Sequence, residues 1–337
     1  MPLSANPFSG SAFNSVALTT AINLLPNMFG RVEQMNLMPA KPVRLRSIAV
    51  ERRNGVLNLL PTVPPGGPAT LNTRGKRDIR QFAIPQIPLE DIVRPEETQG
   101  IRAFGSENEL QAYADVLAMH LQSMRNKHAI TLEHLRMGAL KGIILDADGS
   151  VIYNLFTEFG ITQKVIDFQL SSAALDVKSV CYSLKRHVED NLLGEFSDGI
   201  HCFVSAQFFD AFTSHAKVVK AWELYNQGAV LRDDMRKGFP FAGITFEEYR
   251  GQGSDASGTV HKFIADGEGI AFPTGTTQTF ATHFAPADFI ETVNTLGLPL
   301  YAKQEPVHFD RGTYLHTQSN PLPICNRPEL LVKVTMS

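Results

Sequence analysis

Apolar and polar residues alternate along residues 43–50, and this period of two predicts a β-strand, whose side chains point alternately to its two faces. Residues 61–68 read Pro-Thr-Val-Pro-Pro-Gly-Gly-Pro, a run that favours a turn over a paired strand. A returning limb then passes through Ile79 to residues 82–85. We therefore expect an extended β-hairpin over 41–93. A two-stranded ribbon is marginal alone in water, so this hairpin is expected to lie on another surface.

The strongest helical pattern covers residues 106–141. Ser106 and Glu109 have the spacing of a capping box at its start, and Gly138 and Gly142 mark its end. Its apolar positions recur at helical spacing: Leu110, Tyr113, Ala114, Leu117, Leu121, Met124, Leu132 and Leu135. A continuous helix of this length would run about 50 Å, and a break is conceivable near 126–128, where His128 occupies the apolar stripe.

The other patterns mix helices and strands. Helices are expected at 15–28, 173–193 and 206–214, and strands at 202–204, 241–249, 270–272 and along the tail from 298 to 334. Residues 142–155 predict a hairpin that turns at Asp148 and Gly149, and residues 251–258 predict a flexible surface loop. The fold class predicted by these elements is α+β.

Charge changes the interpretation of the hairpin. The 337-residue chain has 43% hydrophobic and 19% charged residues and a formal net charge of -3, which is ordinary globular composition. Between residues 41 and 82, however, nine basic residues stand against two acidic ones, and an acidic connector follows at 90–105. Such a segment fits either nucleic acid or an acidic patch on another copy of the protein.

The arm has no aromatic residue before Phe82, whereas single-stranded nucleic-acid binding usually combines cations with stacking aromatics. Contact with an acidic neighbouring subunit therefore fits better than DNA binding, and a merely solvated ribbon is the plain alternative. The residues expected to make this contact are Arg44, Arg46, Arg52, Arg53, Arg74, Arg77 and Arg80.

Sequence motifs for chemistry are weak. Cys181, Cys202 and Cys325 are widely spaced and form no CxxC pair, so neither a zinc site nor a disulfide framework is expected. Asp146-Ala147-Asp148-Gly149 lacks the spacing of a calcium loop, and no phosphate loop, nucleophile elbow or HExxH pattern occurs. We expect no catalytic residue, no metal and no cofactor. Without a signal peptide or a membrane-length apolar run, we also expect a soluble intracellular protein and no membrane contact.

The order of these elements resembles that of major capsid proteins of tailed double-stranded DNA bacteriophages, and in particular the lambda-type major capsid protein E family. Similar motifs occur along the chain at 94–102, at Thr131-Leu132-Glu133 with 137–142, and at Asp148-Gly149 before a strand. They continue at 241–244, at 270–273, and at 306–326 with Arg311-Gly312 and 319–323.

The resemblance implies an N-terminal arm, an extended β-hairpin loop, a peripheral domain with a long spine helix, and an axial domain. The corresponding ranges are 1–40 for the arm, 41–93 for the loop, 94–171 for the first peripheral part with the spine helix at 106–141, 172–300 for the axial domain, and 301–337 for the second peripheral part. It also implies self-assembly through pentamers and hexamers into an icosahedral shell, with a scaffolding protein, a portal, a decoration protein and non-specifically packaged double-stranded DNA as partners. The place expected for the protein is the virion, after assembly in the bacterial cytoplasm.

Two other functions stay open from the residues. One is a nucleic-acid-binding protein that uses the basic arm. Salt-sensitive binding of nucleic acid by a soluble monomer would favour this function. The other is a hydrolase built on residues 172–300, with Asp148, Glu133 or a histidine as the base.

Overall fold

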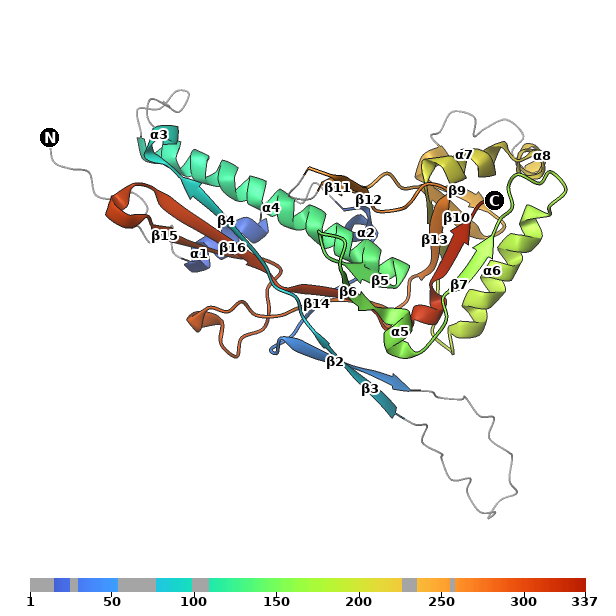
Figure 1. The fold of residues 1–337 in the computed structure, drawn as a ribbon, viewed down its shortest axis with the longest axis horizontal. Helices are drawn as coiled ribbons and strands as arrows, with labels where there is room; N and C mark the ends of the chain where they lie inside the picture. The colour runs from blue at the N-terminus through green and yellow to red at the C-terminus, as the bar shows by residue number, and fades with distance from the viewer. Residues whose placement is uncertain (1–14, 25–29, 54–76, 99–108, 226–234, 255–257) are drawn as a thin grey trace, which may run out of the picture. The chain divides into compact units, whose positions relative to one another are not determined.

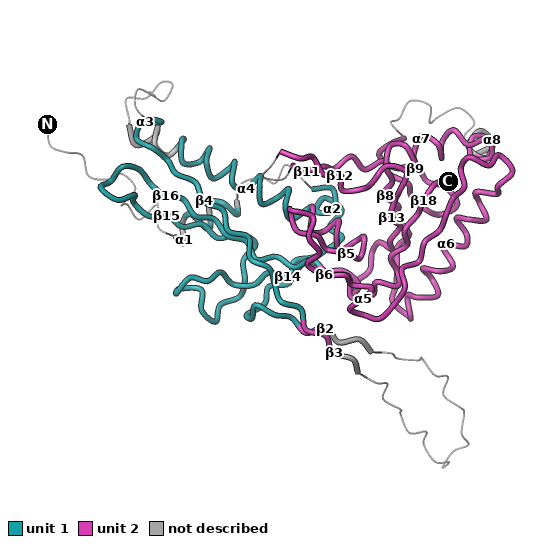
Figure 2. Tube along the Cα trace, in the orientation of Figure 1, with its two compact units in different colours: residues 1–48, 82–133, 282–323 teal, residues 49–81, 134–281, 324–337 magenta. Residues whose placement is uncertain are grey.

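A computed structural model describes the chain except for residues 1–14, 25–29, 54–76, 99–108, 226–234 and 255–257 (Figure 1). The chain divides into two compact units, each built from three separate segments (Figure 2). Unit 1 comprises residues 1–48, 82–133 and 282–323, and unit 2 comprises residues 49–81, 134–281 and 324–337.

Unit 1 contains an antiparallel sheet in the order β15 (Tyr301–Pro306), β16 (Thr313–Ser319), β4 (Ile87–Val93). Helix α1 (Ser15–Leu24) lies along β15, where Thr19 Oγ1 donates to the carbonyl of Ala302 at 3.2 Å. The core of this unit joins α1, the sheet and the long helix α4 (Glu109–Lys141) through Leu18, Ile22, Val93, Val116, Leu117, Leu121, Met124, Leu300, Ala302 and Leu315. The N-terminal segment thus contributes a packed helix to the unit.

Helix α4 is continuous over 33 residues, so the break considered near residues 126–128 does not occur (Figure 1). Gly138 lies inside the helix, whereas Gly142 follows its last residue in a left-handed conformation with φ of 75°. A Cβ at Gly142 would lie 2.4 Å from the ring of Phe156, so both the backbone conformation and the close packing require glycine there. The capping box predicted at Ser106 falls outside the described residues.

Unit 2 is built on a mixed six-stranded sheet in the order β7 (Lys164–Asp167), β18 (Val332–Thr335), β13 (Glu268–Thr274), β8 (Gly199–Val204), β10 (Ile244–Glu248), β9 (Phe239–Phe241). One core combines α6 (Val177–Asn191) and α7 (Ala206–Ser214) with alternate residues of the strands. Ser205 caps α7 by accepting from the Phe208 amide at 3.3 Å, and Phe208, Phe209 and Phe212 then enter the core.

Smaller elements complete the chain. Three strands form the sheet β1 (Ala40–Pro42), β14 (Phe280–Phe284), β17 (Pro321–Cys325). Three strand pairs are β2 (Ser47–Arg53) with β3 (Arg77–Ala83), β5 (Ile143–Leu145) with β6 (Val151–Asn154), and β11 (Gln252–Ser254) with β12 (Val260–Lys262). Short helices are α2 (Arg31–Gln34), α3 (Pro95–Thr98), α5 (Leu155–Phe159) and α8 (Ala216–Tyr225), with 3-10 turns at Met235–Lys237, Ile290–Thr292, His308–Asp310 and Pro328–Leu330.

Several local predictions were wrong. Strand β10 confirms the strand expected at 241–249 from residue 244 onward, but the range does not start as one strand, because Ala242 and Gly243 adopt left-handed conformations with φ of 50° and 81° and reverse the chain between β9 and β10. The loop expected at 251–258 contains β11, which pairs with β12, and its residues 255–257 lie outside the described part. The acidic connector at 90–105 begins inside β4, where Glu90 is exposed and the adjacent Asp91 is half-buried.

The α+β class is confirmed, and so is the hairpin that turns at Asp148 and Gly149. The hairpin pair β2 and β3 begins at Ser47, four residues later than the alternation at 43–50 predicted. Residue 43 instead donates its amide to the Phe284 carbonyl at 2.9 Å, which continues the β1–β14 contact. The division into arm, loop, peripheral and axial parts stays a prediction.

Candidate functional site

The basic arm is the first candidate surface. Arg44 and Arg46 are exposed just before β2, and Arg80 is half-buried on β3. Ile48, Val50 and Phe82 are buried, which gives the two strands one apolar face. The side chains of Arg52, Arg53 and Arg77, and the whole of Arg74, lie outside the described residues.

The base of this arm already contains an ion pair within the chain. An Arg46 Nη2 atom lies 3.8 Å from Asp288, and both side chains are about half exposed. Gln86 Nε2 donates to the same carboxylate at 3.3 Å, and the Ile84 amide donates to the Arg46 carbonyl at 2.8 Å. Exposed ion pairs contribute about 0–1 kcal/mol, so this contact orients Arg46 without adding much stability.

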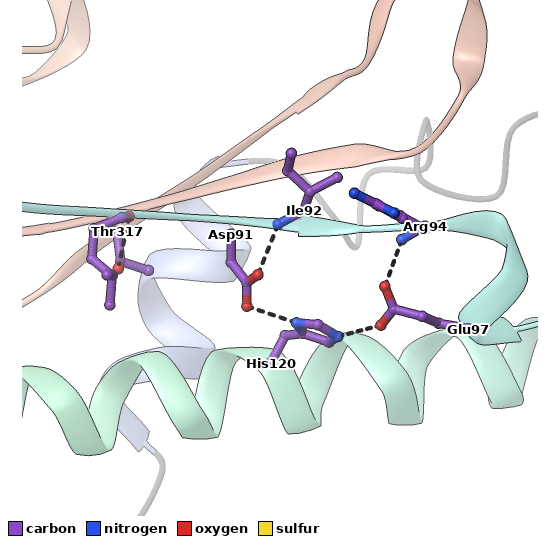
Figure 3. A network of polar contacts seen from close by, with 7 residues as sticks. Asp91, Ile92, Arg94, Glu97, His120 and Thr317 are labelled. Atoms are coloured by element: carbon purple, nitrogen blue, oxygen red, sulfur yellow. Dashed lines mark hydrogen bonds and ion pairs between the residues drawn. The ribbon is translucent and has the colours of Figure 1, made fainter. Parts of the chain in front are cut away.

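The second candidate is a row of polar side chains along α4 within unit 1. Figure 3 shows His120 of α4 between Asp91 of β4 and Glu97 of α3. Its Nδ1 lies 2.7 Å from Asp91 and its Nε2 lies 2.8 Å from Glu97. Carboxylates only accept hydrogen bonds, so both ring nitrogens must donate, and the imidazole is in its charged form.

The pKa values around His120 agree with that geometry. Partial burial opposes the charge of His120, but the hydrogen bonds to Asp91 and Glu97 outweigh it and raise the pKa of the imidazole. Burial raises the pKa of Asp91, but the hydrogen bonds from His120 and the Ile92 amide, together with the nearby positive charges, outweigh burial and lower the pKa of this carboxyl. The amide of Arg94 donates to Glu97 at 3.0 Å and lowers the pKa of that carboxyl. The three groups form one charge-assisted bridge.

Two further residues of α4 hold other segments of unit 1. Arg125 donates to the carbonyl of Ile22 at the end of α1. His128 is buried, and its Nε2 lies 3.0 Å from the hydroxyl of Thr317 on β16. Burial lowers the pKa of His128 to about 4, so this ring is neutral at pH 7. One helix therefore carries a charged and a neutral histidine two turns apart.

Glu133 ends this row. It is buried, and its Oε1 accepts from the Val32 amide of α2 at 3.1 Å. A Cβ on Gly30 would approach the other carboxylate oxygen to 3.1 Å, so the chain passes close to the acid at this point. Through His120, Arg125, His128 and Glu133, the long helix holds α1, α2, α3 and two strands of the sheet.

The residues considered as hydrolytic bases have structural roles. Glu133 holds α2, the ring of His134 lies 5.2 Å from that of Phe263, and Asp148 accepts from the Ser150 amide in the exposed β5–β6 turn. Within the described residues, no cluster of His, Cys, Asp or Glu could hold a metal ion. Cys181, Cys202 and Cys325 are buried and free. In the same part of the chain, no helix is long and apolar enough to cross a bilayer.

Sequence reasoning missed the bridge at His120. Its signals are faint: a histidine and an arginine stand next to the apolar positions 121 and 124 of the helical stripe. The unusual position of His128 in that stripe was noticed but interpreted as a break. The partners Asp91, Glu97 and Thr317 lie far away in sequence, and no local pattern points to them.

Comparison with known sequences gives one consistent result. The profile of the family described as phage major capsid protein E matches residues 14–336. The major capsid protein of Salmonella phage Felix O1 is 30% identical over 356 aligned positions, covering 96% of each chain. The major capsid protein of Pseudomonas phage KPP10 is 28% identical, covering 95% of this chain and 96% of the relative.

Comparison with solved structures concerns the fold. A crystal structure described as a putative capsid protein of a prophage of Escherichia coli CFT073 superimposes with a TM-score of 0.62. The alignment covers 96% of this chain and 99% of that chain, at 16% sequence identity. At that identity the likeness shows a shared fold over nearly all of both chains.

Proposed function

Because this chain belongs to the phage major capsid protein E family, we propose that it builds the icosahedral head of a tailed double-stranded DNA bacteriophage through pentamers and hexamers of itself. The family consists of structural shell proteins, so the chain is a capsid protein of the virion and not an enzyme. The observation that carries this conclusion is the family match over residues 14–336.

The nucleic-acid-binding alternative is not supported. The relatives that cover nearly the whole chain are major capsid proteins, and their similarity includes the segment that contains the basic arm. The hydrolase alternative is not supported either, because its candidate bases Glu133 and Asp148 make the structural contacts described above.

The arm is the part of the proposal that concerns subunit contact. We assign Arg44, Arg46, Arg52, Arg53, Arg74, Arg77 and Arg80 to contacts with acidic residues of a neighbouring subunit. The exposure of Arg44 and Arg46 supports this role. The guanidinium group of Arg46 has several N–H donors, so it can keep its contact with Asp288 and also donate to an acid of a neighbouring subunit. In the same proposal, residues 1–40 form the arm, 41–93 the extended loop, 94–171 and 301–337 the peripheral domain, and 172–300 the axial domain.

The remaining partners belong to the same proposal and follow from the family resemblance. A scaffolding protein and a portal take part in assembly, a decoration protein reinforces the shell, and double-stranded DNA is packaged without sequence preference. The net charge of -3 supports non-specific enclosure of DNA, since it gives the subunit no overall attraction to phosphate.

The test is expression of the chain in bacteria, followed by electron microscopy and sedimentation of the soluble fraction. Closed shells of uniform size are expected, with or without a co-expressed scaffolding protein. A chain that remains a small folded species under both conditions, and that binds DNA in a salt-dependent manner, would contradict the proposal and favour the alternative.

A further inference from the structure

One loop of unit 1 exposes large apolar side chains to solvent and buries a polar one. In the segment from Asp288 to Leu298, named here the 288–298 loop, Thr292 is buried while four large apolar side chains face solvent. Their exposed fractions are 93% for Ile290, 67% for Val293, 51% for Leu296 and 44% for Leu298. Single exposed apolar residues are normal, but four within nine residues of one loop are typical of a surface that contacts a partner.

The loop is held in this conformation by its own polar groups. The Thr292 hydroxyl donates to the Ala287 carbonyl at 2.7 Å, and the Thr295 hydroxyl donates to the Thr292 carbonyl at 2.8 Å. The Gly297 amide donates to the Val43 carbonyl at 3.0 Å. A Cβ at Gly297 would lie 2.1 Å from the Phe284 carbonyl, so the loop is also closely packed at its end. The outward apolar side chains therefore belong to a fixed structure.

The charges of the loop are already paired within the chain. Asp288 faces Arg46 at 3.8 Å, and Lys303 Nζ lies 2.8 Å from Glu291. Lys303 also lies over the ring of Phe289, 4.2 Å from its centroid. A surface whose acids are neutralised and whose projecting side chains are aliphatic fits another apolar protein surface, and it offers nothing to bind a nucleic acid.

We propose that the 288–298 loop is an apolar contact through which one copy of this chain docks on a second copy, with Ile290 and Val293 at its centre. The proposal rests on the proposed function, because a shell of identical subunits supplies the second copy. The loop is joined to the base of the basic arm through Val43 and Arg46. A neighbour that receives Arg44 and Arg46 at the base of the arm is therefore also within reach of the loop. The arm then supplies charge complementarity and the loop supplies buried apolar area.

A cysteine placed in the loop reports its burial directly. All three native cysteines are buried, so Val293→Cys adds the one exposed thiol. A maleimide is expected to modify this thiol readily in the unassembled chain. In shells shown by gel to contain this chain alone, labelling should be about tenfold slower or more, because reaction then requires local opening of a contact. Dissociated shells should regain the fast rate, which serves as the control.

Equal labelling in chain-only shells and in unassembled chain would overturn the inference while leaving the proposed function intact. Protection that appears only when the shell contains a second protein would overturn the choice of a second copy as the occupant. A wild-type chain that forms no shells would instead contradict the proposed function, and the inference with it.

A polar variant tests whether the contact drives assembly. The double variant Ile290→Ser, Leu296→Ser is expected to keep the circular dichroism spectrum of the unassembled chain. It should lower the yield of shells about tenfold or more, because loss of contacts at the centre of an interface weakens binding most. Asn294→Gly is the matched control, because Asn294 is exposed in the same loop with φ of 61° and glycine accepts that conformation. Wild-type shell yield from the double variant would contradict the inference.

Discussion

The Nδ1 atom of His120 lies 2.7 Å from the carboxylate of Asp91, and this contact joins the long helix α4 to strand β4. Since Glu97 faces the other ring nitrogen at 2.8 Å, the imidazole is fixed between two acids and carries a positive charge. The bridge draws α3, α4 and β4 together inside unit 1 (Figure 3).

Replacing His120 by leucine removes both hydrogen bonds and leaves two carboxylates facing each other. We expect the free energy of unfolding to fall by about 1–2 kcal/mol, since the site is partly exposed and water can solvate the acids. Urea denaturation of the unassembled chain measures this change. Met119→Ala, an exposed neighbour on the same helix, should change stability by less than about 0.5 kcal/mol. Equal effects of both variants would contradict the bridge.

The same bridge predicts a pH dependence. The pKa of His120 is raised in the folded chain, so its stabilising contribution is complete below the ordinary pKa and is lost as pH rises through the raised value. The pKa values of Asp91 and Glu97 are lowered, so their contribution is lost in acid. The stability difference between wild type and His120→Leu should therefore be largest at about pH 5 to 6.5. A stability difference between wild type and His120→Leu that grows from pH 6.5 to pH 9 would contradict the charged bridge.

His128 should act in the opposite direction. Its pKa is lowered to about 4, so the unfolded chain binds a proton that the folded chain excludes as pH falls below 6.5. The free energy of unfolding therefore falls by up to about 3 kcal/mol between pH 6.5 and pH 4. His128→Gln keeps an amide near Thr317 but does not titrate, so its stability should fall less steeply between pH 6.5 and 4. His316, whose charge also lowers the pKa of His128, is present in both proteins. Parallel pH profiles would contradict the assignment.

Glu195 gives a test in unit 2. It is mostly buried and accepts from the amides of Thr277 and Gln278 at 2.9 and 2.7 Å and from the Thr279 hydroxyl at 2.7 Å. Arg327 Nη1 also lies 3.5 Å from Glu195. Glu195→Ala should lower the free energy of unfolding by about 2–4 kcal/mol, because the three donors and Arg327 lose their acceptor. Glu189→Ala removes only an exposed pair with Lys185 and should cost less than about 0.5 kcal/mol. Thermal or urea unfolding of the two variants distinguishes these cases.

Long periodic elements were predictable from the sequence. Helix α4 with its end just before Gly142, helix α7, and the turn at Asp148 and Gly149 follow from spacing, glycine positions and caps, which act within a few residues. The hairpin of β9 and β10 was not found, because a left-handed alanine at 242 is rare and its sequence signal is weak.

The sites depend on contacts that no local pattern contains. His120 meets Asp91 from 29 residues away, and His128 meets Thr317 from 189 residues away. The exposure of the apolar residues in the 288–298 loop has no signal in the sequence, because it depends on the inward position of Thr292. Charge along the arm, in contrast, was visible at once in the composition of residues 41–82.

The most direct measurement of the central claim is sedimentation velocity of the wild-type chain beside a variant in which Arg44, Arg46, Arg52, Arg53, Arg74, Arg77 and Arg80 are replaced by glutamate. Wild type is expected to sediment as large uniform shells, whereas the variant should remain a small species with the circular dichroism of a folded chain. A single replacement such as Arg44→Ala should be mild, since one exposed pair contributes about 0–1 kcal/mol. Shells from the sevenfold variant at wild-type yield would contradict the role of the arm, and the absence of shells from wild type would contradict the account as a whole.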